Sequence, residues 1–247
     1  MRSKMPTLVL SSRYSEDSIA LWRAAIARGW DVERLVNWRL PPRLKTVSEP
    51  VLHIEGLMAD AIAEQLGVRL LTPAIDWLPN LPERYRKRWV YLSTLGEFRK
   101  SKTEAFVKPP NDKSFPARVY KIANLPSDYP DEMPILISEI VQWEKEFRCF
   151  ILNRNIKTFS IYLRHGKLQS ENQFIHTHKE ACELRQFMEI LLSEDCVRIP
   201  QATVIDVGTI RGRGWAVVEQ NSAWGAGLYG CDRDRVLEVL KYATVTI

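Results

Sequence analysis

Two carboxylates and an amide in the C-terminal part of the chain could hold a divalent cation. The segment ATVIDVGTIRGRGWAVVEQN, residues 202–221, predicts a β-hairpin whose turn is centred just after Gly212. In the register that this turn sets, Asp206 lies opposite Glu219, and strand alternation puts Asn221 on the same face, within about 5–7 Å. Facing carboxylates repel each other unless a cation lies between them, and this oxygen set suits Mg²⁺. On spacing alone, an accidental pair with one carboxylate in solvent fits equally well.

The chain ahead of this hairpin divides into two parts with different strand patterns. Residues 1–80 alternate strands with helices, which predicts an α/β lobe with a mostly parallel sheet that ends in a proline-containing boundary segment. Residues 81–247 begin with a helix at 83–100 and continue with hairpins, which predicts an α+β part with antiparallel sheets. The other expected elements are strands 7–10, 32–35, 51–54, 68–71, 105–108, 118–122, 135–141, 147–152 and 156–163 and helices 17–28, 57–66, 179–192 and 232–243.

The composition is that of an ordinary folded protein. Of 247 residues, 45% are hydrophobic and 26% charged, which excludes a disordered, fibrous or membrane class. The net charge of +5 suits an anionic ligand, while the basic run at residues 84–89 fits a solvated helix face better than a nucleic-acid site. The four cysteines are widely spaced, and no apolar stretch is long enough for a signal peptide or a membrane span. We therefore expect a cytoplasmic protein without a membrane partner, and nucleic acid is disfavoured as a ligand.

The end of the predicted hairpin resembles a known motif. The sequence VVEQNSAWGAG is similar to the terminal motif of the ATP-grasp enzymes, in which an Asp-bearing strand is followed by a Glu-x-Asn strand and a loop of small residues. Asp206, Glu219 and Asn221 match the magnesium ligands of that family one for one. Upstream, FVKP resembles the strand whose lysine, here Lys108, reaches the phosphates of ATP. The resemblance covers about residues 81–247 and implies that ATP and Mg²⁺ are bound between two subdomains.

Two stretches in the middle of the chain bear on the nucleotide. ILISEIV resembles the hinge strand of the family, whose backbone pairs with the adenine edge, and this implies adenine contacts for Glu139, Ile140 and Val141. The loop after Lys108, PPNDKSFP, departs from the family pattern because it lacks the glycines that fold backbone amides over phosphates. Phosphate contacts would then fall to side chains of this loop or to Lys121.

Further charged residues follow in the family order. The sequence EFR resembles an acidic-x-arginine element, which implies a nucleotide contact for Glu146 and a phosphate or substrate contact for Arg148. Arg164, which ends the next strand, resembles an arginine near the transferred phosphate. The particular form is similar to a small clade named for one arginine and two lysines, in which Trp-Gly and Leu-Tyr-Gly motifs follow the metal residues, as they do here at Trp224 and Leu228.

The resemblance implies an ATP- and Mg²⁺-dependent ligase that joins a carboxylate to an amine through an acylphosphate. Lys108, Arg148 and Arg164 would stabilise the charge on the transferred phosphoryl group. A kinase that stops at phosphoryl transfer stays open as an alternative. So does a non-catalytic module that binds nucleotide or nucleic acid through the basic run. The identities of the acid and the amine, either of them free or carried on a peptide or protein, and the oligomeric state are open at this point.

Overall fold

The N-terminal lobe of the protein is built on a small parallel sheet. A computed structural model describes residues 5–101, 103–121 and 124–247. The elements of the lobe are β1 (Thr7–Leu10), α1 (Glu16–Ala27), β2 (Asp31–Arg34), the 3₁₀ helix η1 (Pro42–Thr46), β3 (Pro50–His53), α2 (Gly56–Leu66) and β4 (Val68–Leu70). The strands β2, β1 and β3 pair in that order and run parallel, as predicted. Ser15 precedes α1 as its N-cap, and its hydroxyl and that of Ser18 form a capping box, while Gly67 ends α2 with a left-handed φ of 67°.

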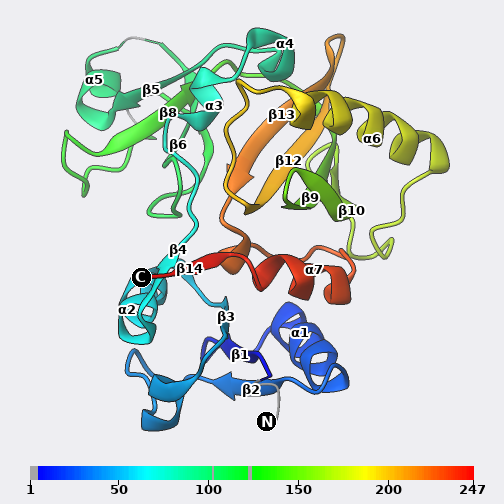
Figure 1. Cartoon of the computed structure of the whole chain (residues 1–247). Coiled ribbons are helices and arrows are strands. Elements are labelled where there is room, and N and C mark those ends of the chain that lie inside the picture. The colour runs from blue at the N-terminus through cyan, green and yellow to red at the C-terminus, as the bar shows by residue number, and fades with distance from the viewer. Residues whose placement is uncertain (1–4, 102, 122–123) are drawn as a thin grey trace.

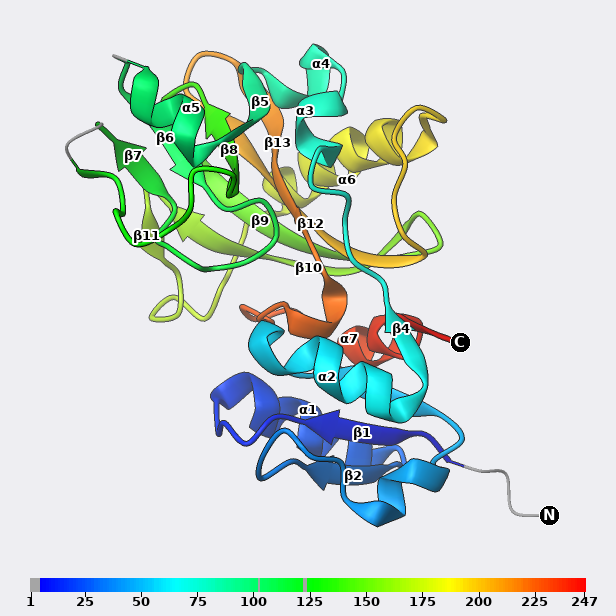
Figure 2. The same cartoon turned by 90° about the vertical axis from the view of Figure 1, so that its left-hand side faces the viewer.

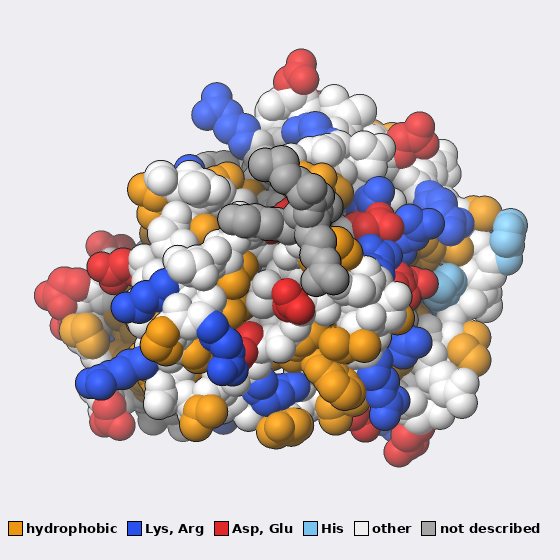
Figure 3. All heavy atoms as spheres, turned by 60° about the horizontal axis from the view of Figure 1, so that its bottom comes forward, with side chains coloured by type: hydrophobic (Ala, Val, Ile, Leu, Met, Phe, Trp, Pro, Cys, Tyr) orange, Lys and Arg blue, Asp and Glu red, His pale blue; other side chains and the backbone are white. Residues whose placement is uncertain are grey.

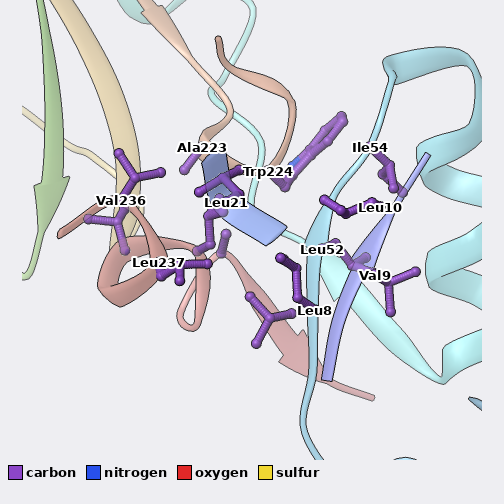
Figure 4. Packing of buried hydrophobic residues seen from close by; sticks show 14 of the residues in the cluster. Leu8, Val9, Leu10, Leu21, Leu52, Ile54, Ala223, Trp224, Val236 and Leu237 are labelled. Carbon is purple, nitrogen blue, oxygen red and sulfur yellow. The ribbon is translucent and has the colours of Figure 1, made fainter. Parts of the chain in front are cut away.

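The C-terminal segment returns to this lobe. It consists of the 3₁₀ helix η3 (Ala223–Gly225), α7 (Arg233–Leu240) and β14 (Thr244–Thr246). β14 pairs with β4 in an antiparallel manner, and α7 lies between the lobe and the rest of the molecule (Figures 1 and 2). Leu8 and Leu21 of the lobe share one hydrophobic cluster with Trp224 and Leu237 (Figure 4). The core of the lobe therefore includes residues from both ends of the described chain.

A four-stranded antiparallel sheet opens the second part. Its strands, in spatial order, are β5 (Val90–Thr94), β8 (Pro134–Ser138), β6 (Ala105–Lys108) and β7 (Arg118–Tyr120). Helix α5 (Leu95–Lys100) packs against it, with Phe98 buried beside Val107 and Ile135. The predicted strand 118–122 reaches residue 122, which lies outside the described residues, and the predicted strand 135–141 ends at Ser138.

A five-stranded antiparallel sheet completes the molecule. Its strands, in spatial order, are β11 (Lys167–Leu168), β10 (Asn155–Arg164), β9 (Trp143–Leu152), β12 (Ala202–Ile210) and β13 (Gly214–Asn221). Helix α6 (His178–Ser193) covers one side of it, with Leu184 and Met188 buried beside Phe147 and Ile205. Thr177 starts α6 with a capping box.

The predicted helix at residues 83–100 is wrong. The segment divides into helix α4 (Glu83–Arg86), strand β5 and helix α5, and one more short helix, α3 (Trp77–Asn80), precedes it. Lys87 takes a left-handed φ of 54°, which ends α4 after one turn. Val90 is then buried while Tyr91 is exposed, the alternation of a strand. The error matters for the site because it moves Arg88 from a helix surface to the link between α4 and β5.

The predicted fold class is confirmed: an α/β lobe with a parallel sheet precedes lobes with antiparallel sheets. No helix in the described part of the chain is long and apolar enough to cross a membrane. We keep the division near residue 80 as a proposal, with the addition that residues 223–246 pack with the first lobe.

Candidate active site

A β-bulge sets which residues of the β12–β13 hairpin face each other. Next to the turn, Ile210 pairs with Gly214 and Val207 with Val217, so the turn has three residues and the register predicted there is off by one. Val218 has no partner on β12, and this extra residue shifts the pairing back, so that Asp206 lies opposite Glu219. The predicted carboxylate pair is therefore observed, although the turn from which it was inferred differs.

Arg88 holds this bulge in place. Its guanidinium donates hydrogen bonds to the carbonyl oxygens of Val217 at 2.7 Å and Val218 at 2.9 Å, and to Oγ of Ser138 at 3.1 Å. The residue is only 6% exposed, so the interpretation of the basic run as a solvated helix face is wrong for Arg88. Burial, and then the like charge of Arg86, lower the pKa of Arg88 to about 10, which leaves it charged at neutral pH. Arg88 thus joins β8 to β13, the strand that carries Glu219.

Arg88→Met is expected to lower the free energy of unfolding by about 1–3 kcal/mol, because two carbonyl oxygens at the bulge lose their buried donors. Equilibrium unfolding in urea measures this change. Arg84→Met provides the matched control, since Arg84 belongs to the same basic run but pairs with Glu194 in an exposed position. Equal stability of the two variants would show that Arg88 does not hold the bulge.

Five of the predicted site residues form one hydrogen-bonded cluster. Arg148 binds Asp206 through two bonds, Nε to Oδ1 at 3.0 Å and Nη2 to Oδ2 at 2.6 Å. Lys108 forms an ion pair with Oε2 of Glu219. Nδ2 of Asn221 lies 3.2 Å from Oδ2 of Asp206 and 3.0 Å from Oε1 of Glu219. The cluster joins β6, β9 and the β12–β13 hairpin, three parts of the chain that are far apart in the sequence.

The charges of the cluster balance in pairs. Burial would raise the pKa of Glu219, but the charge and hydrogen bond of Lys108 outweigh it and lower the pKa to about 2. Asp206 is completely buried, and this burial raises its pKa while Arg148 opposes the rise. Arg148 is itself 7% exposed, and Asp206 raises its pKa despite burial. Each carboxylate therefore has its own cation.

The geometry of the cluster fits a magnesium ion. One oxygen of Asp206 and one of Glu219 lie within hydrogen-bond distance of the same Asn221 nitrogen, so the two carboxylates converge on one point. A half-turn of the Asn221 amide would present its oxygen to that point instead. No group of three or more His, Cys, Asp or Glu side chains suited to a metal occurs among the described residues. Two carboxylates with an amide leave coordination positions for water and phosphate, as is typical of Mg²⁺.

A cavity of about 280 Å³ adjoins this cluster between the two antiparallel sheets. Lys108 and Glu219 line one part of it, and the predicted hinge residues Glu139, Ile140 and Val141 line another. Apolar side chains from both sheets and from α3 complete much of the wall: Leu78, Val90, Phe106, Val119, Leu136 and Val218. A mostly apolar cavity with a charged end is a suitable shape for a flat base joined to an anionic group.

Contacts of Glu139 anchor the predicted hinge segment. Its backbone N–H donates to the carbonyl oxygen of Trp89 at 3.1 Å, and its carboxylate binds Arg213 at 2.5 and 3.0 Å. In the described part of the chain, the peptide groups of Ile140 and Val141 have no backbone hydrogen-bond partner. These groups are thus available to a ligand in the cavity, whereas the Glu139 side chain points to the hairpin turn.

Two predicted residues lie apart from the cluster. Arg164 binds Glu180 at the start of α6 through two bonds of 2.7 and 2.8 Å. Lys121 is exposed and lies 3.6 Å from Glu104. Neither residue lines the cavity.

Two tyrosines lie beside Arg148: Tyr229, which belongs to the predicted Leu-Tyr-Gly motif, and Tyr162, which the sequence did not indicate. Tyr162 donates a hydrogen bond to Glu146 at 2.8 Å, and it stacks on Tyr229 with 5.3 Å between ring centroids. The guanidinium of Arg148 lies over both rings, at 5.5 and 4.7 Å. Tyr162 sits at a bulge of β10, which two-residue periodicity cannot reveal. Glu146 also lines the cavity, and burial raises its pKa to about 7.

Two antiparallel lobes around a cavity, with an Asp-bearing strand next to a Glu-x-Asn strand at its end, define the ATP-grasp class of proteins. Residues 85–239 match the ATP-grasp domain of R2K clade family 2, and the chain belongs to this family. The predicted resemblance is confirmed.

Solved structures share the fold at low sequence identity. The D-alanine–D-alanine ligase of Bacillus anthracis matches with a TM-score of 0.60 and 12% identity, over 97% of each chain. An ATP-grasp RimK domain protein of Sphaerobacter thermophilus DSM 20745 matches with a TM-score of 0.57 and 14% identity, over 96% of this chain and 99% of that one. The ATP-grasp ligase PsnB, solved with a minimal precursor, matches with a TM-score of 0.55 and 12% identity, over 96% of this chain and 99% of that one. No curated protein matches the chain in sequence.

Proposed function

We propose that the protein is an ATP- and Mg²⁺-dependent ligase that forms an amide from a carboxylate and an amine. The observation that carries the proposal is the cluster of Lys108, Arg148, Asp206, Glu219 and Asn221 at the end of the cavity. Proteins of the same fold support it: the Bacillus anthracis ligase was solved in complex with ATP, and PsnB with a minimal precursor, Mg and ADP.

The residues of the cavity suit the parts of ATP. The peptide groups of Ile140 and Val141 would pair with the adenine edge, next to Glu139, while Glu146 would contact the nucleotide between base and phosphates. Lys108 would release Glu219 and bind phosphate oxygens. Lys121 and Arg164, which lie outside the cavity lining, stay predictions.

Asp206, Glu219 and Asn221 would hold magnesium, which would neutralise charge on the β- and γ-phosphates. A carboxylate oxygen of the substrate attacks the γ-phosphorus and ADP leaves, which gives an acylphosphate. The amine then attacks the acyl carbon, inorganic phosphate leaves, and the amine nitrogen loses a proton. Lys108 and Arg148 stabilise the charge during the first step, so that no nucleophilic side chain of the protein is needed.

The alternative of a nucleic-acid-binding module gains no support from the surface seen in Figure 3. On this face, Lys and Arg side chains lie among acidic and hydrophobic ones rather than in one continuous basic patch. Arg88 of the basic run is buried at the bulge, and Arg84 is paired with Glu194.

The test is to incubate the protein with Mg-ATP and pools of amino acids, polyamines and peptides, and to follow ADP, AMP and product masses. We expect ADP together with a product whose mass equals acid plus amine minus water. A phosphorylated substrate without condensation would show a kinase, and release of AMP would contradict the acylphosphate route. The Glu219→Gln variant serves as the inactive control.

A further inference from the structure

The loop that follows β13 is held from the side of the N-terminal lobe. The backbone N–H of Ile54 donates to the carbonyl oxygen of Trp224 at 3.0 Å, and Nε1 of Trp224 donates to the carbonyl oxygen of Leu71 at 3.2 Å. Nε2 of His53 lies 3.1 Å from the carbonyl oxygen of Ala226, and burial lowers the pKa of this histidine. These hydrogen bonds fix the position of the loop, and all of them join uncharged groups.

Asp17 adds a charge to this loop. It lies in the first turn of α1, and its Oδ2 accepts a hydrogen bond of 2.8 Å from the backbone N–H of Leu228. Gly227 permits the approach, because a Cβ atom there would stand 3.2 Å from the same oxygen. The carboxylate thus reaches the backbone of a segment 211 residues away in the sequence.

The same peptide group binds Arg148 on its other side. The carbonyl oxygen of Gly227 accepts a hydrogen bond of 3.0 Å from Nη1 of Arg148, and this carbonyl and the N–H of Leu228 belong to one peptide bond. A carboxylate on the N–H polarises the peptide and makes its oxygen a stronger acceptor. Asp17 therefore strengthens the hold on Arg148.

Arg148 in turn orients Asp206. Its Nε and Nη2 bind the two oxygens of Asp206, and the Nη1 bond to Gly227, together with the rings of Tyr162 and Tyr229, holds the guanidinium in place. When a cation binds Asp206, the bond to Gly227 holds the Arg148 guanidinium in place. Arg148 then neither moves with the carboxylate nor covers the oxygens that face the cation. One continuous line of contacts then runs from the N-terminal lobe to the metal-facing oxygens.

We propose that Asp17 is a positioning residue of the metal site, which acts through the Gly227–Leu228 peptide and Arg148 on Asp206. The proposal rests on the proposed function, since it takes Asp206 to be a metal ligand. It assigns to the N-terminal lobe a part in metal affinity, although the lobe supplies no ligand.

The experiment measures binding of Mn²⁺ to the full chain with ADP present, by electron paramagnetic resonance, for wild type, Asp17→Ala, Asp17→Asn and Glu16→Ala. Asp17→Ala is expected to raise the Mn²⁺ dissociation constant about 10-fold, the lower end of the roughly 10- to 100-fold losses found when groups that orient a metal ligand are removed. Asp17→Asn keeps an acceptor oxygen for Leu228 without the charge and is expected to fall between Asp17→Ala and wild type. Glu16→Ala removes an exposed acidic residue of the same helix turn and should bind as wild type does.

A second readout separates positioning from folding. The Mg²⁺ concentration for half-maximal ATP turnover should rise in Asp17→Ala, while KM for ATP at saturating Mg²⁺ stays within about twofold. Lower thermal stability of Asp17→Ala with an unchanged Mn²⁺ dissociation constant would overturn the proposal, and so would equal Mn²⁺ binding by Asp17→Ala and Glu16→Ala. If wild-type protein binds no Mn²⁺ with ADP, the proposed function itself fails and this proposal falls with it.

Discussion

Asp206→Asn and Glu219→Gln are each expected to lower magnesium-dependent ATP turnover by roughly 100-fold or more, because each removes one negative charge from the point where a cation would bind. Both replacements keep the shape of the side chain. Turnover is measured as ADP release against Mg²⁺ concentration, and excess Mg²⁺ is not expected to restore it.

The two variants should differ in stability. Glu219 and its partner Lys108 are both partly exposed, so the new glutamine amide and the Lys108 ammonium can be solvated, and Glu219→Gln should unfold near the wild-type temperature. Asp206 is completely buried, and Asp206→Asn leaves the buried Arg148 guanidinium with a neutral partner, so this variant should unfold at a lower temperature. Glu49→Gln is the control, since Glu49 pairs with Lys241 outside the site. Undiminished turnover in both site variants would refute the assignment of the metal ligands.

Arg148→Met is expected to lower the free energy of unfolding by about 3–5 kcal/mol, because it leaves the buried Asp206 carboxylate without a cation. The carbonyl oxygen of Gly227 loses its donor in the same variant. ATP turnover should be lost as well, since the carboxylate is no longer oriented. Urea unfolding followed by circular dichroism gives the stability, and ADP release gives the turnover.

A matched control and a double variant make this prediction specific. Arg164→Met removes an arginine from the end of β10 that pairs with Glu180 in a partly exposed position, and it should cost about 1 kcal/mol or less. Arg148→Met combined with Asp206→Asn should recover part of the lost stability, because no buried charge is then left unpaired. A destabilisation by Arg148→Met no larger than that by Arg164→Met would contradict the buried pair.

The sequence was sufficient to place the carboxylate pair, but for a reason that is only partly correct. A two-residue turn predicts the Asp206–Glu219 pairing, whereas the hairpin has a three-residue turn and a bulge at Val218 that compensates for it. The two deviations cancel at the site. The alternation of side chains along a strand does not reveal a single extra residue, so the pairing of residues next to the turn could not be predicted.

The residues that support the cluster were harder to predict than its members. Lys108, Arg148 and Glu219 follow from an ordered set of motifs, which is why the family could be identified. Arg88 and Tyr162 act through contacts with distant strands, and Arg88 looked like one more residue of a surface run. Such contacts depend on tertiary packing, which overrides local composition.

The return of the C-terminal segment to the N-terminal lobe has a consequence for how the protein is made. The parallel sheet β2-β1-β3 leaves the ribosome before the C-terminal segment does, yet the cluster that buries Leu8 and Leu21 also needs Trp224 and Leu237. Domains whose residues are contiguous can fold as they emerge, whereas this lobe must wait until residues as late as Leu237 have been synthesised. We therefore expect the lobe to stay incompletely folded during translation, and the Asp17 contact to Leu228 to be among the last to form.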